Sequence, residues 1–85
     1  MKLKVLYFAS VREKVGKDAE ELDVPAGVVT VEALRSHLRG CGGNYENAFA
    51  ERALLRAAVN QDMVQPSARI KAGDEVAFFP PVTGG

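Results

Sequence analysis

KLKVLYFA, residues 2–9, and EVAFF, residues 75–79, are the stretches that decide the fold of this 85-residue chain. Both are rich in residues that favour β-strands, and side chains along a strand alternate between its two faces. In the first stretch this alternation predicts Leu3, Val5 and Tyr7 on the buried face. Most of the chain separates the two strands, so they cannot form a hairpin, and we expect them to pair in the centre of a sheet.

The last strand has a matching alternation. Val76 and Phe78 are predicted to face inward, which turns Phe79 outward. Phe8 on the first strand is likewise predicted to point outward, so the two rings would form an exposed aromatic patch. The alternative is that a bulge shifts either alternation and buries both rings.

TVEALRSHLR, residues 30–39, is the clearest helix. Thr30 is a favourable N-cap, and Val31, Leu34 and Leu38 fall three and four residues apart, which gives one narrow apolar stripe. The other patterns predict a polar turn with at most one helical turn at 10–16, an exposed edge strand at 19–24, a short helix at 45–52, a strand at 54–61, a short return strand at 63–64 and a glycine turn at 70–74.

Strands outnumber helices in this order, and one helix can cover one face of a small mixed sheet. The predicted fold class is therefore α+β, a β-grasp (ubiquitin-like) fold with one main helix packed on one face of the sheet. A chain of 85 residues is long enough for one domain and not for two. We expect a β-grasp domain over residues 1–81 and a flexible C-terminal Gly-Gly tail over residues 82–85.

The composition excludes several classes of protein. Eleven basic and eleven acidic side chains give a formal net charge of zero, which argues against binding to nucleic acid. The first residues run straight into a strand, so we expect no signal peptide, and no stretch has the apolar length of a membrane span. The single cysteine cannot form an internal disulfide. These features predict a cytoplasmic protein that binds neither nucleic acid nor membrane.

The side chains offer no convincing internal active site. His37, the one histidine, lies within the predicted helix, and Cys41, the one cysteine, lies in a glycine loop. These two side chains alone cannot make a zinc site of the usual kind, and nothing else near Cys41 would activate its thiol. Asp74 and Glu75 follow Gly73 and are interpreted as a solvated turn.

The end of the chain is more informative. The last ten residues carry no charged side chain, whereas flexible tails are usually polar. Pro80 and Pro81 force an extended, stiff exit from the last strand. Gly84 and Gly85 lack a Cβ and can enter a channel too narrow for other residues. A terminal carboxylate is ionised and a poor electrophile, so another protein would have to activate it, for example as an acyl-adenylate.

Three parts of the sequence carry a resemblance to a known family. They are KVLYFASVREKVG at 4–16, TVEALRSHLR with LLRAAVNQ at 30–39 and 54–61, and GDEVAFFPPVTGG at 73–85. Together they resemble the MoaD family of ubiquitin-like sulfur carriers, the small subunits of molybdopterin synthase. The last segment is the most specific, and residues 40–53 match least.

The resemblance implies that an ATP-dependent activating enzyme adenylates Gly85 and that sulfur then converts it to a thiocarboxylate. Gly84 would thread into the large subunit of molybdopterin synthase, in a heterotetramer of two small and two large subunits, where the sulfur passes to cyclic pyranopterin monophosphate. The chain itself is expected to hold no cofactor or metal, because the activating partner uses the ATP. The residues expected to contact partners are Phe8, Met63, Phe79, Pro80, Pro81 and, through a polar contact, Arg12.

Two other readings remain open. A Gly-Gly end alone also fits a sulfur carrier for thiamin or tRNA thiolation, or ubiquitin-like conjugation to lysines, although FFPPV at 78–82 favours the first reading. The chain could instead be an interaction module with an inert tail. Whether to regard it as an enzyme also stays open, since it would be the sulfur-donating subunit of a sulfurtransferase complex, without catalytic side chains of its own.

Overall fold

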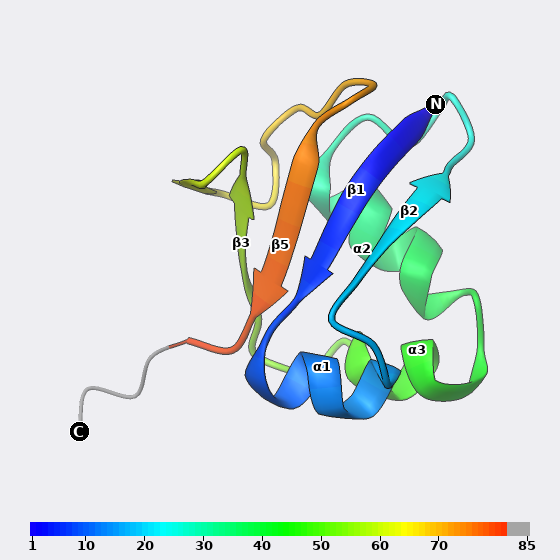
Figure 1. Cartoon of the computed structure of the whole chain (residues 1–85), viewed down its shortest axis with the longest axis vertical. Coiled ribbons are helices and arrows are strands. Elements are labelled where there is room, and N and C mark those ends of the chain that lie inside the picture. The colour runs from blue at the N-terminus through cyan, green and yellow to red at the C-terminus, as the bar shows by residue number, and fades with distance from the viewer. Residues whose placement is uncertain (82–85) are drawn as a thin grey trace.

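The computed structural model describes residues 1–81, and Figure 1 shows a twisted sheet with α2 and α3 behind it and α1 across its lower end. The predicted tail, residues 82–85, lies outside the described residues. The elements in chain order are β1 (Lys2–Tyr7), α1 (Ala9–Val15), β2 (Ala19–Asp23), α2 (Val31–Arg39), α3 (Gly43–Ala48), β3 (Arg56–Val59), β4 (Asp62–Val64) and β5 (Glu75–Phe79).

The sheet has five strands in the order β2-β1-β5-β3-β4. β1 and β5 run parallel, with Tyr7 opposite Phe78, and the other neighbouring strands are antiparallel. This confirms the central pairing of the first and last strands and the α+β, β-grasp prediction. β2 is an edge strand, as its adjacent glutamates predicted, and it pairs Lys4 of β1 with Glu21.

The core lies between the sheet and the helices. The inward residues of β1 are almost fully buried, as are Val31, Leu34 and Leu38 of α2. The Oγ1 of Thr30 accepts a hydrogen bond of 3.1 Å from the backbone nitrogen of Ala33, so the predicted N-cap of α2 is confirmed. Phe49, which is fully buried, packs edge-on against Tyr7 and Phe78, with ring centroids 6.1 Å and 5.1 Å away. Aromatic pairs in such edge-to-face geometry stabilise a core beyond the area that they bury.

The predicted turn at 10–16 is wrong, because residues 9–15 form the seven-residue helix α1. Val11 and Val15 lie four residues apart, and both are buried against the core. That burial stabilises a helix that its own sequence only weakly favours. Gly16 ends the helix in the left-handed conformation, with φ of 89°, which glycine adopts without strain.

Two further boundaries differ. The helix predicted at 45–52 spans Gly43–Ala48, and the strand predicted at 54–61 spans only Arg56–Val59. The strand stops early because Asn60 and Gln61 have positive φ values of 50° and 74° and form the turn into β4. Asparagine is tolerated in this conformation better than most residues.

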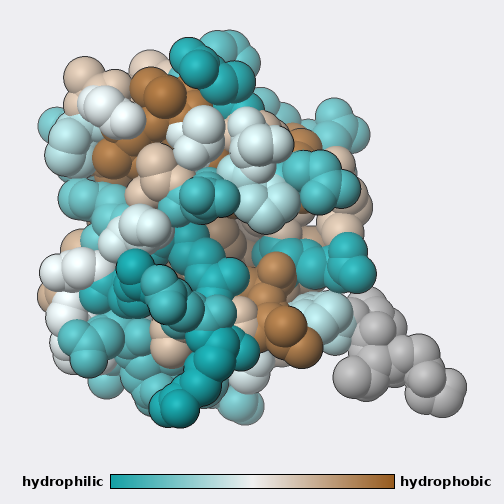
Figure 2. All heavy atoms as spheres, turned by 180° about the vertical axis from the view of Figure 1, so that it is seen from behind, coloured by the Kyte–Doolittle hydropathy of each residue, from teal (hydrophilic) through white to brown (hydrophobic). Residues whose placement is uncertain are grey.

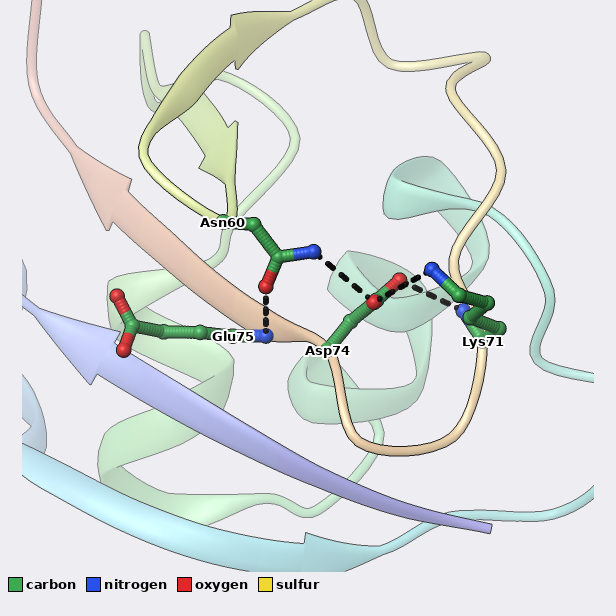
Figure 3. Close-up of polar contacts among 4 residues, drawn as sticks. All are labelled: Asn60, Lys71, Asp74 and Glu75. Carbon is green, nitrogen blue, oxygen red and sulfur yellow. Dashed lines mark hydrogen bonds and ion pairs between the residues drawn. The ribbon is translucent and has the colours of Figure 1, made fainter.

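Asp74 contradicts the solvated-turn interpretation, because it is only 4% exposed. Figure 3 shows its carboxylate between Asn60 and Lys71. It accepts hydrogen bonds of 3.0 Å from Asn60 Nδ2, 2.8 Å from the backbone nitrogen of Lys71 and 3.1 Å from Lys71 Nζ. Asn60 Oδ1 in turn accepts from the backbone nitrogen of Glu75 at 3.0 Å. Burial alone would raise the pKa of Asp74, but the bonds from Asn60 and Lys71 outweigh it and hold the pKa below its ordinary value.

Candidate functional site

The face of the sheet opposite the helices carries a continuous apolar row. Strand register places Leu6 of β1 beside Ala77 of β5, Ala77 beside Ala58 of β3, and Ala58 beside Met63 of β4. All four alternate with inward residues, so their side chains share the outer face. The two alanines are small and only 8% and 9% exposed, so the middle of the row is flat, while Met63 is 60% exposed at the sheet edge. A flat apolar strip of this kind suits contact with another protein.

A second row on the same face contains Phe8, Phe79 and Arg56. It lies two residues nearer the carboxyl end of β5 than the first row. Phe79 is opposite Arg56 of β3, and the backbone nitrogen of Phe8 donates to the Phe78 carbonyl at 3.2 Å, so the chain continues beside β5 past the end of β1. Phe8 is 47% exposed, whereas Phe79 is half-buried. The outward side of both residues agrees with the predicted alternation, although Phe79 is less exposed than an open aromatic patch requires.

The chain leaves the sheet beside the second row, directly after Phe79. Pro80 and Pro81 follow Phe79 directly and are half-buried. They lack a backbone N–H and cannot extend the hydrogen-bonded ladder, which is why β5 stops here. Arg12 is exposed on α1, one turn from Phe8, whose carbonyl accepts from the Arg12 nitrogen at 3.3 Å. Gly84 and Gly85, the predicted reactive end, lie outside the described residues.

The comparisons with known proteins bear on this arrangement. Residues 5–85 match the ThiS family. The chain belongs to the ThiS family. It is 53% identical, over 98% of its length and 99% of the relative's, to the molybdopterin synthase sulfur carrier subunit of Escherichia coli (strain K12). The resemblance to the small subunits of molybdopterin synthase is therefore confirmed.

Solved structures agree on the fold. A putative molybdopterin converting factor, subunit 1, from Pyrococcus furiosus superimposes with a TM-score of 0.79 at 33% identity, covering 96% of this chain and 99% of that one. A chain of the protein–protein complex of subunits 1 and 2 of the molybdopterin-converting factor from Helicobacter pylori 26695 has a TM-score of 0.66 at 19% identity, with full coverage of both chains. The second likeness supports the fold alone.

Beside the apolar rows of this ThiS-family chain, sequence reasoning missed a groove of about 630 Å³ between α2 and residues 54–66. Leu54, Met63 and Pro81 contribute apolar surface to its lining, and Leu54 is 77% exposed. Figure 2 views the molecule from the helix side and shows hydrophobic spheres gathered at the lower right of the body, on the side of β3. Leu54 was assigned to a strand from its sequence, so no signal there indicated that it would stand open to solvent.

Arginines of α2 fix the wall of this groove. Arg35 Nη2 donates to the carbonyls of Ala50 and Ala53 at 2.6 and 2.7 Å, which holds the loop before β3 in place. Burial, and secondarily the nearby charge of Arg39, lower the pKa of Arg35. Arg39 forms an ion pair of 3.3 Å with Glu51.

The remaining polar cluster is structural. Glu20 Oε2 accepts from the hydroxyls of Tyr7 and Tyr45 at 2.7 and 2.6 Å, and Lys17 Nζ lies 3.3 Å from its Oε1. Burial raises the pKa of Tyr7 far above its ordinary value, and the bond to Glu20 adds to this effect. The cluster joins β1, β2 and α3, and both carboxylate oxygens of Glu20 accept hydrogen bonds within it.

The two candidate reactive side chains lie away from the rows. Cys41 is exposed after α2, with its Sγ 3.5 Å from the carbonyl oxygen of His37, and His37 is half-buried. Within residues 1–81, no three histidine, cysteine or carboxylate side chains gather as metal ligands. In the same part of the chain, no helix is long and apolar enough to cross a membrane.

Proposed function

We propose that this chain is the sulfur carrier subunit of a molybdopterin synthase. The observation that carries the proposal is its 53% identity, along nearly the full length of both chains, to the Escherichia coli protein of that name. The apolar rows beside the exit of the chain fit this role, because a carrier must present its end to a partner while its folded body is held outside.

The chemistry proceeds at the carboxylate of Gly85. An activating enzyme transfers AMP from ATP to this carboxylate and releases pyrophosphate. A sulfur nucleophile then displaces AMP, and the carboxylate becomes a thiocarboxylate. In the synthase, the thiocarboxylate sulfur forms a bond to a carbon of cyclic pyranopterin monophosphate and displaces an oxygen substituent from that carbon. Water then hydrolyses the acyl–sulfur bond, so that the sulfur stays on the pterin and the carrier leaves with its carboxylate restored. Two such transfers supply the two sulfurs of the dithiolene.

The folded domain supplies recognition. Gly84 passes through a narrow channel because it has no Cβ, and Pro80 with Pro81 directs the chain away from the sheet. Phe8, Phe79 and Met63 contact the partner, as does Arg12 through its guanidinium. The same residues contact both partners, the large subunit and the activating enzyme. The synthase is a complex of two small and two large subunits. ATP binds to the activating enzyme alone. Catalytic side chains belong to those partners, and the carrier itself needs no cofactor.

The first test is the intact mass of the full chain after incubation with the activating enzyme, ATP and a sulfur donor. Exchange of one oxygen for one sulfur at the C-terminus is expected. An unchanged mass, under conditions that load a known carrier, would rule out every sulfur-carrier reading.

The second test supplies the loaded carrier with the large subunit and the pterin precursor. Formation of molybdopterin is expected. Loading followed by sulfur delivery only to thiamin or tRNA precursors would reject the synthase role while keeping the carrier chemistry.

A further inference from the structure

The groove between α2 and residues 54–66 meets the outer sheet face at one corner of the molecule. Among residues 1–81, the large apolar side chains most open to solvent are Phe8, Leu54 and Met63, and the last two line this groove. Met63 also ends the apolar row of the sheet, so the groove and the row are continuous. A solvent-exposed apolar surface that continues a docking face adds to the area that a partner can bury.

The charges of the groove are unbalanced. Its lining holds three arginines and two glutamates, Glu32 and Glu51. Arg35 is held by backbone carbonyls and Arg39 by Glu51. Arg56 has no ion pair with any of residues 1–81 among the four salt bridges found there.

The position of Arg56 explains its exposure. It is the first residue of β3, and β4 pairs with β3 only from Ala57 onward, so Arg56 projects past the end of β4. It stands opposite Phe79 in the register and also lines the groove. Arg56 therefore lies where the lining of the groove meets Phe79, the residue that precedes the exit of the chain. A guanidinium binds carboxylates with paired hydrogen bonds.

We propose that this groove is a second half of the docking surface and receives an extended segment of the large synthase subunit, with an apolar side chain over Leu54 and Met63 and a carboxylate on Arg56. This inference rests on the proposed function and names the partner surface for it. An extended chain segment fits better than a small ligand, because a lining residue as open as Leu54 cannot enclose a ligand. The apolar centre with a charged rim is the usual composition of a protein interface.

The test measures binding of the purified full-length carrier to the large subunit by calorimetry. Leu54→Asp and Arg56→Glu are each expected to weaken the affinity at least about tenfold. Arg69→Glu makes the same charge change at an exposed residue outside the groove lining, and it is expected to bind as the unchanged chain does. Circular dichroism of each variant verifies that it is folded. Added salt should weaken binding of the unchanged chain more than that of Arg56→Glu.

A photo-crosslinking residue at position 54 gives a second readout that does not depend on affinity. It is expected to capture the large subunit, whereas the same residue at position 69 is not. Adenylation of Gly85 by the activating enzyme should be unaltered by Leu54→Asp.

Several results would overturn the proposal. If the unchanged chain binds and both groove variants bind equally well, the groove is not part of the interface. If Leu54→Asp slows adenylation and spares large-subunit binding, the groove serves the activating enzyme. If sedimentation shows that the isolated chain is a dimer that Leu54→Asp dissociates, the occupant is a second copy. Failure of the unchanged chain to bind the large subunit would instead contradict the proposed function.

Discussion

Replacing Asp74 with alanine removes the centre of the corner that joins β5 to the β3–β4 hairpin. The buried carboxylate accepts two hydrogen bonds inside this corner, from Asn60 Nδ2 and from the backbone nitrogen of Lys71. The third bond comes from the Lys71 ammonium, on a side chain that is 82% exposed, and adds little, since solvent screens such pairs. In the Asp74→Ala variant, the two inner donors lose their acceptor.

Hydrogen bonds to a charged group contribute about 1.5–3 kcal/mol each, and the cost of burying that charge offsets part of the sum. We therefore expect Asp74→Ala to lower the free energy of unfolding by about 3 kcal/mol. Asp74→Asn keeps the shape and one acceptor oxygen and should lose less, about 1–2 kcal/mol. Asp62→Ala is the matched control, because Asp62 is an exposed aspartate of the same hairpin and should change stability by no more than about 0.5 kcal/mol.

Urea denaturation followed by circular dichroism measures these differences, with the slope of free energy against urea unchanged. The pH dependence is a further check. The pKa of Asp74 is lower in the folded chain, so its contribution is complete above the unfolded-state pKa of about 3.9 and disappears as pH falls through the folded-state pKa. The gap between the unchanged chain and Asp74→Asn should therefore close under acid. A loss below about 1 kcal/mol for Asp74→Ala at neutral pH, or a gap that widens in acid, would refute the reasoning.

Three other outcomes are expected. Phe49→Ala should lower the free energy of unfolding by about 4 kcal/mol in the same urea assay, because it removes the ring that touches Tyr7 and Phe78; a loss below about 2 kcal/mol would mean that this part of the core can repack. Thr30→Ala should lose about 1 kcal/mol with the N-cap bond, and Thr30→Ser should restore most of it. Adding one residue after Gly85 should abolish sulfur loading, read by intact mass, without changing the thermal midpoint, so that loading of the extended chain would contradict the proposed chemistry.

Local pattern was sufficient for the centre of the fold. Alternation along β1 and β5 assigned the inward residues correctly, and the apolar spacing and cap of α2 predicted its bounds to within one residue. α1 was missed because Val11 and Val15 give only two apolar positions, which a turn also permits. Contacts with residues distant in the sequence stabilise α1, and a short stretch of sequence does not reveal such contacts.

The candidate site was only partly predictable for the same reason. The alternation of side chains along each strand was enough to predict that Phe8 and Phe79 point outward. The apolar row could not be predicted in this way, because it depends on the strand register that brings Leu6, Ala77 and Ala58 together from three separate segments. Burial of Asp74 depends on a turn fourteen residues earlier in the chain. The groove depends on the loop that Arg35 holds by hydrogen bonds to the backbone carbonyls of Ala50 and Ala53. Every residue has a backbone carbonyl, so the sequence does not indicate which ones Arg35 contacts.

The parallel pairing of β1 with β5 also governs when the molecule can fold. Its partners are about seventy positions apart, with Tyr7 beside Phe78, so β1 cannot complete its pairing on the sheet until nearly the whole chain has been synthesised. Contacts this distant slow folding, since a long loop must close before they form. A nascent chain that stops short of β5 lacks the strand between β1 and β3, and with it the apolar row through Ala77 and the neighbouring row through Phe79. Under the proposed function, the docking surface is therefore assembled only on a chain that already carries the strand leading to its C-terminus, so an incomplete chain would not compete for the partners of the complete one.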